Sequence, residues 1–295
     1  MTTTTALLQA LADAADATPY HTSLGIRVEE LEPDGARLRI PYTDANSNPG
    51  RALHGGVYAS ASDIAGARAA TAGADGAATL DRRTLDLSVC YLAAAIGEDI
   101  VADAHVLRRG KELAYASVAV RNDAGKALAT GLVTHRMAPE GPADRELVVT
   151  PDTAPPDAAE IPDLARAIMG VPFIAGRGMR ITHMHDGRSR VVMPWAPGNA
   201  GAAGVVHEGA VAALLDTAGA MASWSVVGID FRYKASTVGI HASFHAPAQE
   251  EDVVAAARTL RRTNESFLNT VTVWGAASGR TIATGSVTYR IVVPA

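Results

Sequence analysis

The chain has 295 residues, of which 48% are hydrophobic and 19% charged, and its formal net charge is −5. This length allows two domains, and this composition is that of a globular protein rather than a disordered one. Acidic and basic residues are interspersed without a long basic block, so nucleic acid is an unexpected partner. No stretch of about 18–20 residues stays apolar without a charge, so no membrane span is predicted.

The cysteine content and the first residues predict the compartment. Cys90 is the single cysteine, which excludes an internal disulfide and fits a reducing environment. The first residues lack the charged and apolar regions of a signal peptide. We therefore expect a cytoplasmic protein.

An internal repeat organises the chain. His54 and Asp63 recur as His207 and Asp216, in each case 153 positions later. The same spacing relates further pairs, namely Pro19 and Pro172, Gly25 and Gly178, Pro41 and Pro194, Thr84 and Thr237, Tyr91 and Phe244, and Arg108-Arg109 and Arg261-Arg262. Near the end the spacing shifts by one, where 129–131 matches 283–285. The repeat predicts two copies of one domain, over residues 1–137 and 163–295.

The segment between the copies, residues 138–162, has a different composition. It holds six of the chain's 15 prolines, and six acidic residues against one arginine. Because sequence rich in proline and acid stays extended and solvated, we predict a linker here.

Each copy follows one pattern of elements. In the first copy we predict strands over 24–31, 36–42, 84–91, 100–109, 112–122 and 127–136, and a helix from Gly55 to about Gly73. Turns are expected at Pro33-Asp34-Gly35 and at residues 122–125. Alternation in the segment 84–91 places Leu85, Leu87, Val89 and Tyr91 on one face. In the second copy Val238, Ile240, Ala242 and Phe244 repeat that face. A helix of small residues followed by an antiparallel meander predicts an α+β fold, twice, with a sheet wrapped around a buried helix.

One motif carries the chemistry. The first copy reads Asn48-Pro-Gly-Arg-Ala-Leu-His54-Gly55-Gly56, with Asp63 nine residues after His54. This resembles the PaaI-like branch of the hotdog-fold acyl-CoA thioesterases, in which Asn-x-x-Gly-x-x-His-Gly-Gly leads into the central helix and an Asp or Glu follows nine residues after the His. Thr84 resembles the Ser or Thr that starts the family's next strand and helps to hold water. The doubled motif is specific, and the resemblance covers nearly all of both copies.

The resemblance implies a tandem, double-hotdog enzyme that hydrolyses an acyl- or aryl-CoA thioester. It implies no metal and no cofactor apart from the CoA that the substrate carries. The chain resembles a covalent version of the dimer formed by single-copy relatives, and a homo-oligomer of two such chains is expected.

The physical chemistry of the motif agrees with this expectation. A helix N-terminus offers unpaired amide N–H groups and a positive dipole end, which suit a developing oxyanion. Glycine at position 55 leaves that amide unobstructed. A carboxylate such as Asp63 among small helix residues is costly to bury without a task or a partner. It can activate water as a general base or attack the thioester.

Helix geometry predicts that each site combines both copies. Nine residues along a helix rise by about 13 Å, so the His and the Asp of one copy cannot meet around one carbonyl. We therefore predict two hybrid sites. The first joins Asn48, His54 and Gly55 to Asp216 and Thr237, and the second joins His207 and Glu208 to Asp63 and Thr84.

The two predicted sites differ. Gly201 occupies the position of Asn48 in the second copy, with Asn199 two residues away, and Glu208 replaces Gly55. A carboxylate beside an oxyanion hole is unfavourable and can narrow the pocket. We predict that the first site is the better catalyst.

Basic turns are candidates for the coenzyme phosphates. The residues are Arg108, Arg109 and Lys111, mirrored by Arg261 and Arg262. Exposed basic turns are common, so a solvated surface explains them equally well.

Structural readings stand beside the functional ones. The two aspartates could be satisfied by buried hydrogen bonds, the two histidines could anchor their loops, and the two threonines could be ordinary strand residues. Trp195, Trp224 and Trp274 are expected to pack, and no metal site is predicted. Two rival functions remain, a hydroxyacyl-thioester dehydratase and a non-catalytic acyl-CoA-binding or regulatory module. The Asp nine residues after the His disfavours the dehydratase.

Overall fold

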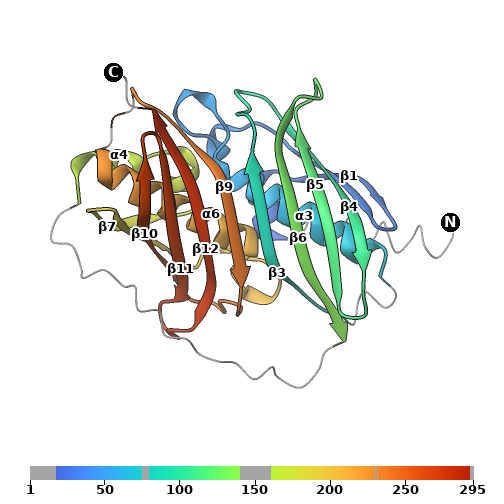
Figure 1. Cartoon of the computed structure of the whole chain (residues 1–295). Helices are drawn as coiled ribbons and strands as arrows, with labels where there is room; N and C mark the ends of the chain where they lie inside the picture. The colour runs from blue at the N-terminus through green and yellow to red at the C-terminus, as the bar shows by residue number, and fades with distance from the viewer. Residues whose placement is uncertain (1–17, 75–79, 140–160, 229, 231, 293–295) are drawn as a thin grey trace.

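The computed structural model describes residues 18–74, 80–139, 161–228, 230 and 232–292. These residues contain a 12-stranded sheet in the order β1-β2-β4-β5-β6-β3-β9-β12-β11-β10-β8-β7. The centre of the sheet is the antiparallel pair β3 and β9, one strand from each copy. The two copies therefore join edge to edge into one continuous sheet (Figure 1).

The strands have matching lengths in the two copies. Those of the first copy are β1 (Arg27–Glu32), β2 (Gly35–Ile40), β3 (Leu80–Tyr91), β4 (Ile100–Arg109), β5 (Leu113–Arg121) and β6 (Ala127–Pro139). Those of the second are β7 (Arg180–His185), β8 (Arg188–Met193), β9 (Lys234–Phe244), β10 (Val253–Thr263), β11 (Ser266–Gly275) and β12 (Thr281–Val292).

Two long helices, α3 (Gly55–Ala72) and α6 (Glu208–Val227), lie side by side on one face of this sheet (Figure 1). Three short helices accompany them, α2 (Pro19–Leu24), α4 (Asp163–Met169) and α5 (Pro172–Gly176). Single 3₁₀ turns cover Asp44–Asn46, Pro49–Arg51, Pro197–Asn199 and Ala202–Gly204. The predicted α+β fold, built twice, is confirmed.

The long helices run antiparallel, and small residues let them approach closely. Gly56 of α3 lies against Ala213 of α6, and Gly209 of α6 lies against Ser60 of α3. A Cβ atom at either glycine would overlap or crowd the facing helix, so a larger residue would push the helices apart. This packing places the start of each helix beside the middle of the other.

The short helices were not predicted, and the first predicted strand was wrong at its start. The chain is helical from Pro19 to Leu24, where proline occupies the first helical turn that it favours. Gly25 then turns the chain with φ 71°, and β1 begins only at Arg27. The equivalent Gly178 has φ 66°, so the repeat extends to this turn.

A bulge in β3 and another in β9 interrupt the predicted strict alternation. Pairing shifts between Thr84 and Asp86 in β3, and between the partners of Thr237 and Gly239 in β9. Consequently Thr84 and Leu87 are both buried, although strict alternation separates them. Val238, predicted to share a face with Ile240, is 39% exposed because it is the bulged residue, whereas Ile240 is buried. The bulge is what turns Thr84 and Thr237 toward the helices.

Most of the predicted linker lies outside the described residues. Strand β6 continues to Pro139, two residues beyond the predicted domain end, and α4 begins at Asp163. Helix α6 alone among the described helices is long and apolar enough to cross a membrane, with a mean hydropathy of 1.4. Of its most apolar window, 83% is buried, where it packs against the sheet and against α3 as a core helix does.

Candidate active site

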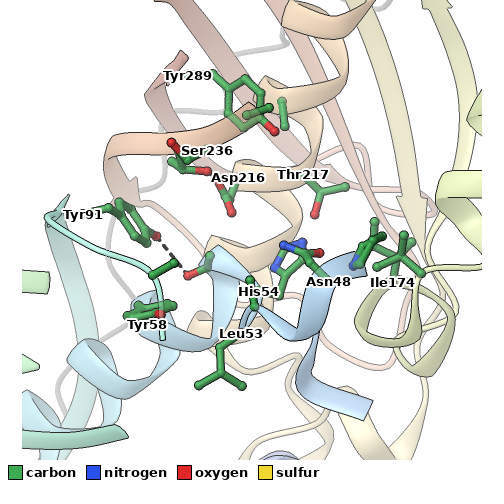
Figure 2. Close-up of a pocket in the computed structure, with 18 of the residues that line it drawn as sticks. Asn48, Leu53, His54, Tyr58, Tyr91, Ile174, Asp216, Thr217, Ser236 and Tyr289 are labelled. Atoms are coloured by element: carbon green, nitrogen blue, oxygen red, sulfur yellow. Dashed lines mark hydrogen bonds between the residues drawn. The ribbon is translucent and has the colours of Figure 1, made fainter. Parts of the chain in front are cut away.

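The start of α3 faces the middle of α6. A Cβ atom at Gly55 would lie 2.5 Å from Oδ2 of Asp216 and 3.4 Å from Oγ1 of Thr237. Thr237 donates a hydrogen bond of 2.7 Å to Oδ1 of Asp216. The structure therefore brings Gly55 of the first copy together with Asp216 and Thr237 of the second. Figure 2 shows Asp216 directed toward the start of α3, beside His54.

His54 caps α3. Its Nδ1 accepts a hydrogen bond of 2.9 Å from the amide of Gly56, and its ring stacks on Phe173 at 4.2 Å between centroids. Burial and, secondarily, the nearby Arg177 charge lower the pKa of His54 to about 3. The imidazole is therefore neutral at physiological pH and anchors the helix start, which supports the structural reading of this residue.

Burial controls the charge of Asp216. The side chain is 3% exposed, and this burial raises its pKa to about 6, although the hydrogen bond from Thr237 opposes the shift. The carboxyl is therefore mostly ionised at neutral pH and gains a proton in mild acid. A carboxylate with a pKa near neutrality is suited to accept a proton from water.

The amide of Gly55 is available to a ligand. As the first residue of α3 it has no intrahelical acceptor, and no hydrogen bond between described residues uses its N–H. Tyr91 donates a hydrogen bond of 3.1 Å to the carbonyl of Gly55, which fixes the orientation of this residue (Figure 2). Gly55 and Asp216 thus present a donor and a carboxylate to the same space.

That space is a cavity of about 420 Å³. Its exposed lining residues lie where the 3₁₀ turn before α3, the end of β3 and the start of β9 meet: Pro49, Leu92, Ala94, Ala235 and Ser236. Its buried lining residues lie in helices α3 to α6 or directly beside their ends: Leu53, His54, Tyr58, Ile168, Val171, Ile174, Asp216, Thr217, Ala220, Met221 and Trp224. The cavity therefore opens at the strand ends and has an apolar interior.

The aromatic part of the cavity lining was not predicted. Trp224, expected only to pack, stacks on Tyr233 at 6.3 Å, and its Nε1 donates a hydrogen bond of 3.3 Å to the hydroxyl of Tyr289. All three rings line the cavity. The spacing of residues along α6 could have indicated it, because Asp216, Thr217, Ala220, Met221 and Trp224 lie on one face of a helix.

The unpredicted helices α4 and α5 complete the wall. Ile168 and Val171 flank the end of α4, and Ile174 lies in α5. At the matching place in the other site, α2 contributes Tyr20, which stacks on His207 at 4.9 Å between centroids. Each copy's leading helix therefore covers the histidine of the other copy.

The second hybrid site has the same backbone but is closed. Thr84 donates a hydrogen bond of 2.5 Å to Oδ1 of Asp63, and Nδ1 of His207 lies 3.8 Å from Oδ2 of Asp63. The cavity next to Glu208 measures only about 40 Å³. The four predicted residues do meet, and the cavity that the described residues form beside Thr84 and Glu208 is small.

Glu208 also occupies its own amide. Its carboxylate accepts a hydrogen bond from its own backbone N–H, the group that corresponds to the free amide of Gly55. Burial raises the pKa of Glu208, and burial and the Glu208 charge raise the pKa of Asp63 to about 8. At neutral pH Asp63 therefore favours its protonated form, in which it cannot accept a proton from water.

Asp63, His207 and Glu208 have potential metal-binding atoms within 4.8 Å of one another. However, Nδ1 of His207 accepts the amide of Gly209 at 2.9 Å, and its Nε2 lies 3.0 Å from Nε2 of His21. Both ring nitrogens are engaged, so the imidazole offers no free lone pair. We assign no metal to this cluster.

Asn48 lines the cavity of the first site, whereas Gly201 replaces it in the second copy. The nearby Asn199 does not substitute for it. Asn199 is buried and donates to the carbonyl of Arg177, as Asn46 does to that of Leu24. Asn199 is therefore the counterpart of the structural Asn46.

The structure does not bring the five sequence-predicted basic residues to the cavity. Arg108, Arg109, Lys111, Arg261 and Arg262 are absent from its described lining. Arg109 is paired with Asp34, and the guanidinium of Arg262 lies 5.4 Å from the ring centroid of Phe267. A role in phosphate binding gains no geometric support from this placement.

The fold and the site together define a tandem hotdog protein with one open and one closed hybrid site. The model of the thioesterase superfamily matches residues 50–129 and 203–282, one match in each copy. The chain belongs to the thioesterase superfamily. This membership confirms the predicted family and its doubled form, and a thioester hydrolase is the class of enzyme that this family defines.

The curated relatives match a stretch of this chain that is about as long as one copy. Acyl-coenzyme A thioesterase 13 of Homo sapiens is 32% identical over 114 residues, which is 38% of this chain and 79% of that protein. A protein of Halobacterium salinarum that carries an esterase name is 38% identical over 100 residues, 33% of this chain and 66% of that protein.

Solved structures match the whole chain. An acyl-CoA thioesterase II of Mycobacterium marinum has a TM-score of 0.65 at 14% identity, covering 94% of this chain and 99% of that one. The tesB protein of Mycobacterium avium subsp. paratuberculosis has a TM-score of 0.63 at 15% identity, covering 96% and 100%. At this identity the similarity shows the fold alone.

Proposed function

We propose that this chain hydrolyses an acyl-CoA thioester to a free acid and CoA at the first hybrid site. The observation that carries the proposal is the position of Oδ2 of Asp216 opposite Gly55 inside a cavity of about 420 Å³. The names of the curated relatives point to the same class of substrate.

In the proposed reaction, the thioester carbonyl lies at the start of α3. The amide of Gly55 donates to the carbonyl oxygen, and its donation strengthens as that oxygen becomes an oxyanion. Asp216 removes a proton from water, the hydroxide adds to the acyl carbon, and the C–S bond breaks. The thiolate of CoA leaves and is protonated, so one water is added across the bond.

Each neighbouring residue supports one of these steps. Thr237 holds one oxygen of Asp216 and leaves the other for water. His54 fixes the helix start through the amide of Gly56, and Tyr91 orients Gly55 through its carbonyl. Direct attack of Asp216 on the thioester is the alternative route, and a single turnover in ¹⁸O water distinguishes the two. Label in the Asp216 carboxylate would reveal a covalent intermediate.

The acyl group is proposed to occupy the buried apolar end of the cavity. Met221, Trp224 and Ile174 line this end and exclude water from it. Aryl and medium-chain acyl groups suit such a lining. The substrate supplies CoA, and no further cofactor is proposed.

The second hybrid site is proposed to be silent. Its cavity of about 40 Å³ and the occupied amide of Glu208 favour the non-catalytic alternative for this half of the chain. An assembly of two such chains stays a proposal, which light scattering of the purified protein would test.

The decisive experiment is thiol release from a panel of acyl- and aryl-CoAs by the wild type and by Asp216→Asn. We expect turnover by the wild type and its loss in the variant. If the wild type binds acyl-CoA but releases no thiol from any member, the whole chain is a binding module and the hydrolase proposal fails.

A further inference from the structure

A positively charged side chain that was not predicted as a site residue, Arg51, lies at the rim of the open cavity. Arg51 is exposed and lies between Pro49 and Ala52, both of which line the cavity. The carbonyl of Arg51 accepts a hydrogen bond of 2.8 Å from Gly97, and Ala52 pairs with Ile96. Arg51 therefore belongs to the two loops that form one side of the entrance.

The side chain of Arg51 is held in place by neutral groups. Its guanidinium carbon lies 5.4 Å from the ring centroid of Tyr42, and a Cβ atom at Gly97 would lie 2.7 Å from its Nη2. A planar guanidinium on an aromatic ring keeps its edge free for further hydrogen bonds.

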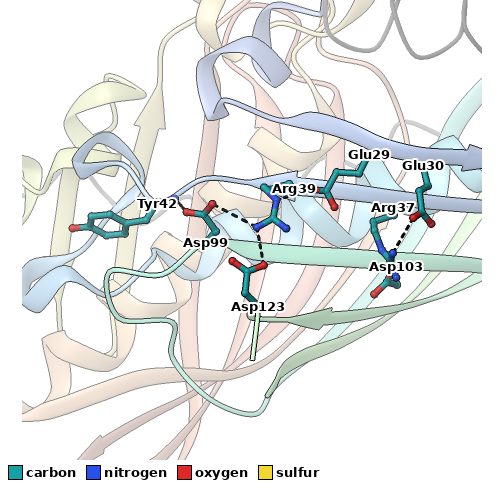
Figure 3. Close-up of polar contacts among 8 residues, drawn as sticks. All are labelled: Glu29, Glu30, Arg37, Arg39, Tyr42, Asp99, Asp103 and Asp123. Atoms are coloured by element: carbon teal, nitrogen blue, oxygen red, sulfur yellow. Dashed lines mark hydrogen bonds and ion pairs between the residues drawn. The ribbon is translucent and has the colours of Figure 1, made fainter. Parts of the chain in front are cut away.

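Neighbouring arginines of the same copy are neutralised, whereas Arg51 is not. Arg39 pairs with Glu29, Asp99 and Asp123, and Arg37 pairs with Glu30 and Asp103 (Figure 3). Among the described residues Arg51 makes no ion pair. Glu98 of the adjacent loop accepts a hydrogen bond of 2.6 Å from Asn122 instead. Arg51 thus keeps an uncompensated positive charge at the entrance.

The repeat supplies an internal control. In the second copy the positions of Arg51 and Gly97 are taken by Gly204 and Glu250. A Cβ atom at Gly204 would lie 2.7 Å from Oε1 of Glu250, so a carboxylate stands where the first copy has a guanidinium. At this pair of positions the charge is therefore positive beside the open cavity and negative beside the closed one.

The rim beside Arg51 is also apolar. Leu92 is 58% exposed and Ile96 is 52% exposed, and Leu92 lines the cavity. Exposed apolar side chains next to a single cation suit a ligand with an apolar arm and a terminal phosphate.

We propose that Arg51 binds a phosphate group of the coenzyme, with the pantetheine arm lying over Leu92 and Ile96. This inference rests on the proposed function, because it assumes that the thioester end of the ligand reaches Gly55. It places the coenzyme at the loops before α3 and after β3, away from the sequence-predicted basic turns.

Two substitutions of Arg51 test the site. Arg51→Gln removes the charge and keeps most of the stem. Arg51→Gly installs the residue of the second copy, and it suits the backbone, since Arg51 has a φ of 62° and Gly204 one of 77°. Arg188→Gln, an exposed arginine on β8 outside the described cavity lining, is the matched control.

The readout compares thioesters with and without phosphate. Each protein is assayed with an acyl-CoA and with the same acyl group on N-acetylcysteamine, and free CoA binding is measured by calorimetry. We expect both Arg51 variants to raise KM for the acyl-CoA and Kd for CoA about tenfold. Their kcat/KM for the N-acetylcysteamine thioester should stay within about twofold.

The outcomes separate this inference from the proposed function. If the wild type hydrolyses acyl-CoA and both Arg51 variants match it, or if Arg108→Gln raises KM instead, the phosphate site lies elsewhere and the inference is overturned. If the wild type hydrolyses nothing, calorimetry with CoA still decides for or against Arg51. An equal loss on both thioesters would indicate a structural role and would also overturn it.

Discussion

The two hybrid sites share one backbone arrangement but differ in the size of the cavity beside them. Around Gly55 and Asp216 the cavity measures about 420 Å³, whereas beside Glu208 it measures about 40 Å³. Both sites keep the histidine cap on the helix and the hydrogen bond from threonine to aspartate. The difference therefore lies in the residue after the histidine and in the side chains around it.

This comparison teaches which parts of the motif are structural. The histidine, the second glycine and the threonine persist in the closed site because they hold the helix start, the helix contact and the carboxyl. The first glycine does not persist, and the carboxylate of its replacement, Glu208, interacts with the amide that corresponds to the proposed oxyanion donor. The start of α3 thus keeps a free amide, whereas the start of α6 does not.

The largest expected effect comes from the two aspartates. Asp216→Asn should lower kcat by about 10³-fold or more, because it removes the proposed base. Asp63→Asn should leave kcat within about threefold. Steady-state thiol release measures both, and melting curves check the fold. Equal losses of kcat in the two variants would show that both sites are active and would contradict a silent second site.

The next effect concerns the residue at each helix start. Gly55→Ala should lower kcat/KM by about 10²-fold, since its Cβ would lie 2.5 Å from Oδ2 of Asp216 and block the amide. Glu208→Gly should free the amide of the second site without reducing turnover. Measured in the Asp216→Asn background, a return of activity after Glu208→Gly would show that Glu208 alone silences the second site. If Glu208→Gly restores no activity in this background, other residues that line the second site also prevent catalysis there.

The pH profile should report Asp216. Its pKa is raised to about 6 by burial, and the ionised form is the one that accepts a proton. Log kcat/KM should therefore be level above about pH 7 and fall by about one unit per pH unit well below 6. Asp63→Asn should not move this profile, although the pKa of Asp63 is raised to about 8. A second inflection near 8 that disappears in Asp63→Asn would contradict a silent second site.

The smallest expected effect sharpens the identity of the acyl group. Trp224 stands two turns of α6, about 12 Å, beyond Asp216 and ends the stripe of lining residues. Trp224→Ala should raise the ratio of kcat/KM for long over short acyl chains about tenfold. Ala220→Leu should shift the ratio the other way. Trp274→Ala, a control outside the described lining, should leave it unchanged, and an unchanged ratio in Trp224→Ala would move the end of the acyl site elsewhere.

The sequence by itself determined the repeat, the fold and the pairing of the sites. One spacing of 153 residues defined two copies, and the distance from His54 to Asp63 along a helix excluded a site within one copy. Glu208 in place of glycine also predicted that the second site is the weaker catalyst, and this stays a prediction. These features follow from local spacing and helix geometry, which sequence encodes directly.

Only the tertiary structure decided what surrounds the reactive groups. The bulges that turn Thr84 and Thr237 inward, the short helices α4 and α5 over the first site, and the aromatic end at Trp224 depend on long-range packing. The same is true of Arg51, which a hydrogen bond from Gly97 in the loop after β3 holds beside the cavity entrance. Cavity size and pKa depend on which side chains meet in space, and spacing along the chain does not specify that.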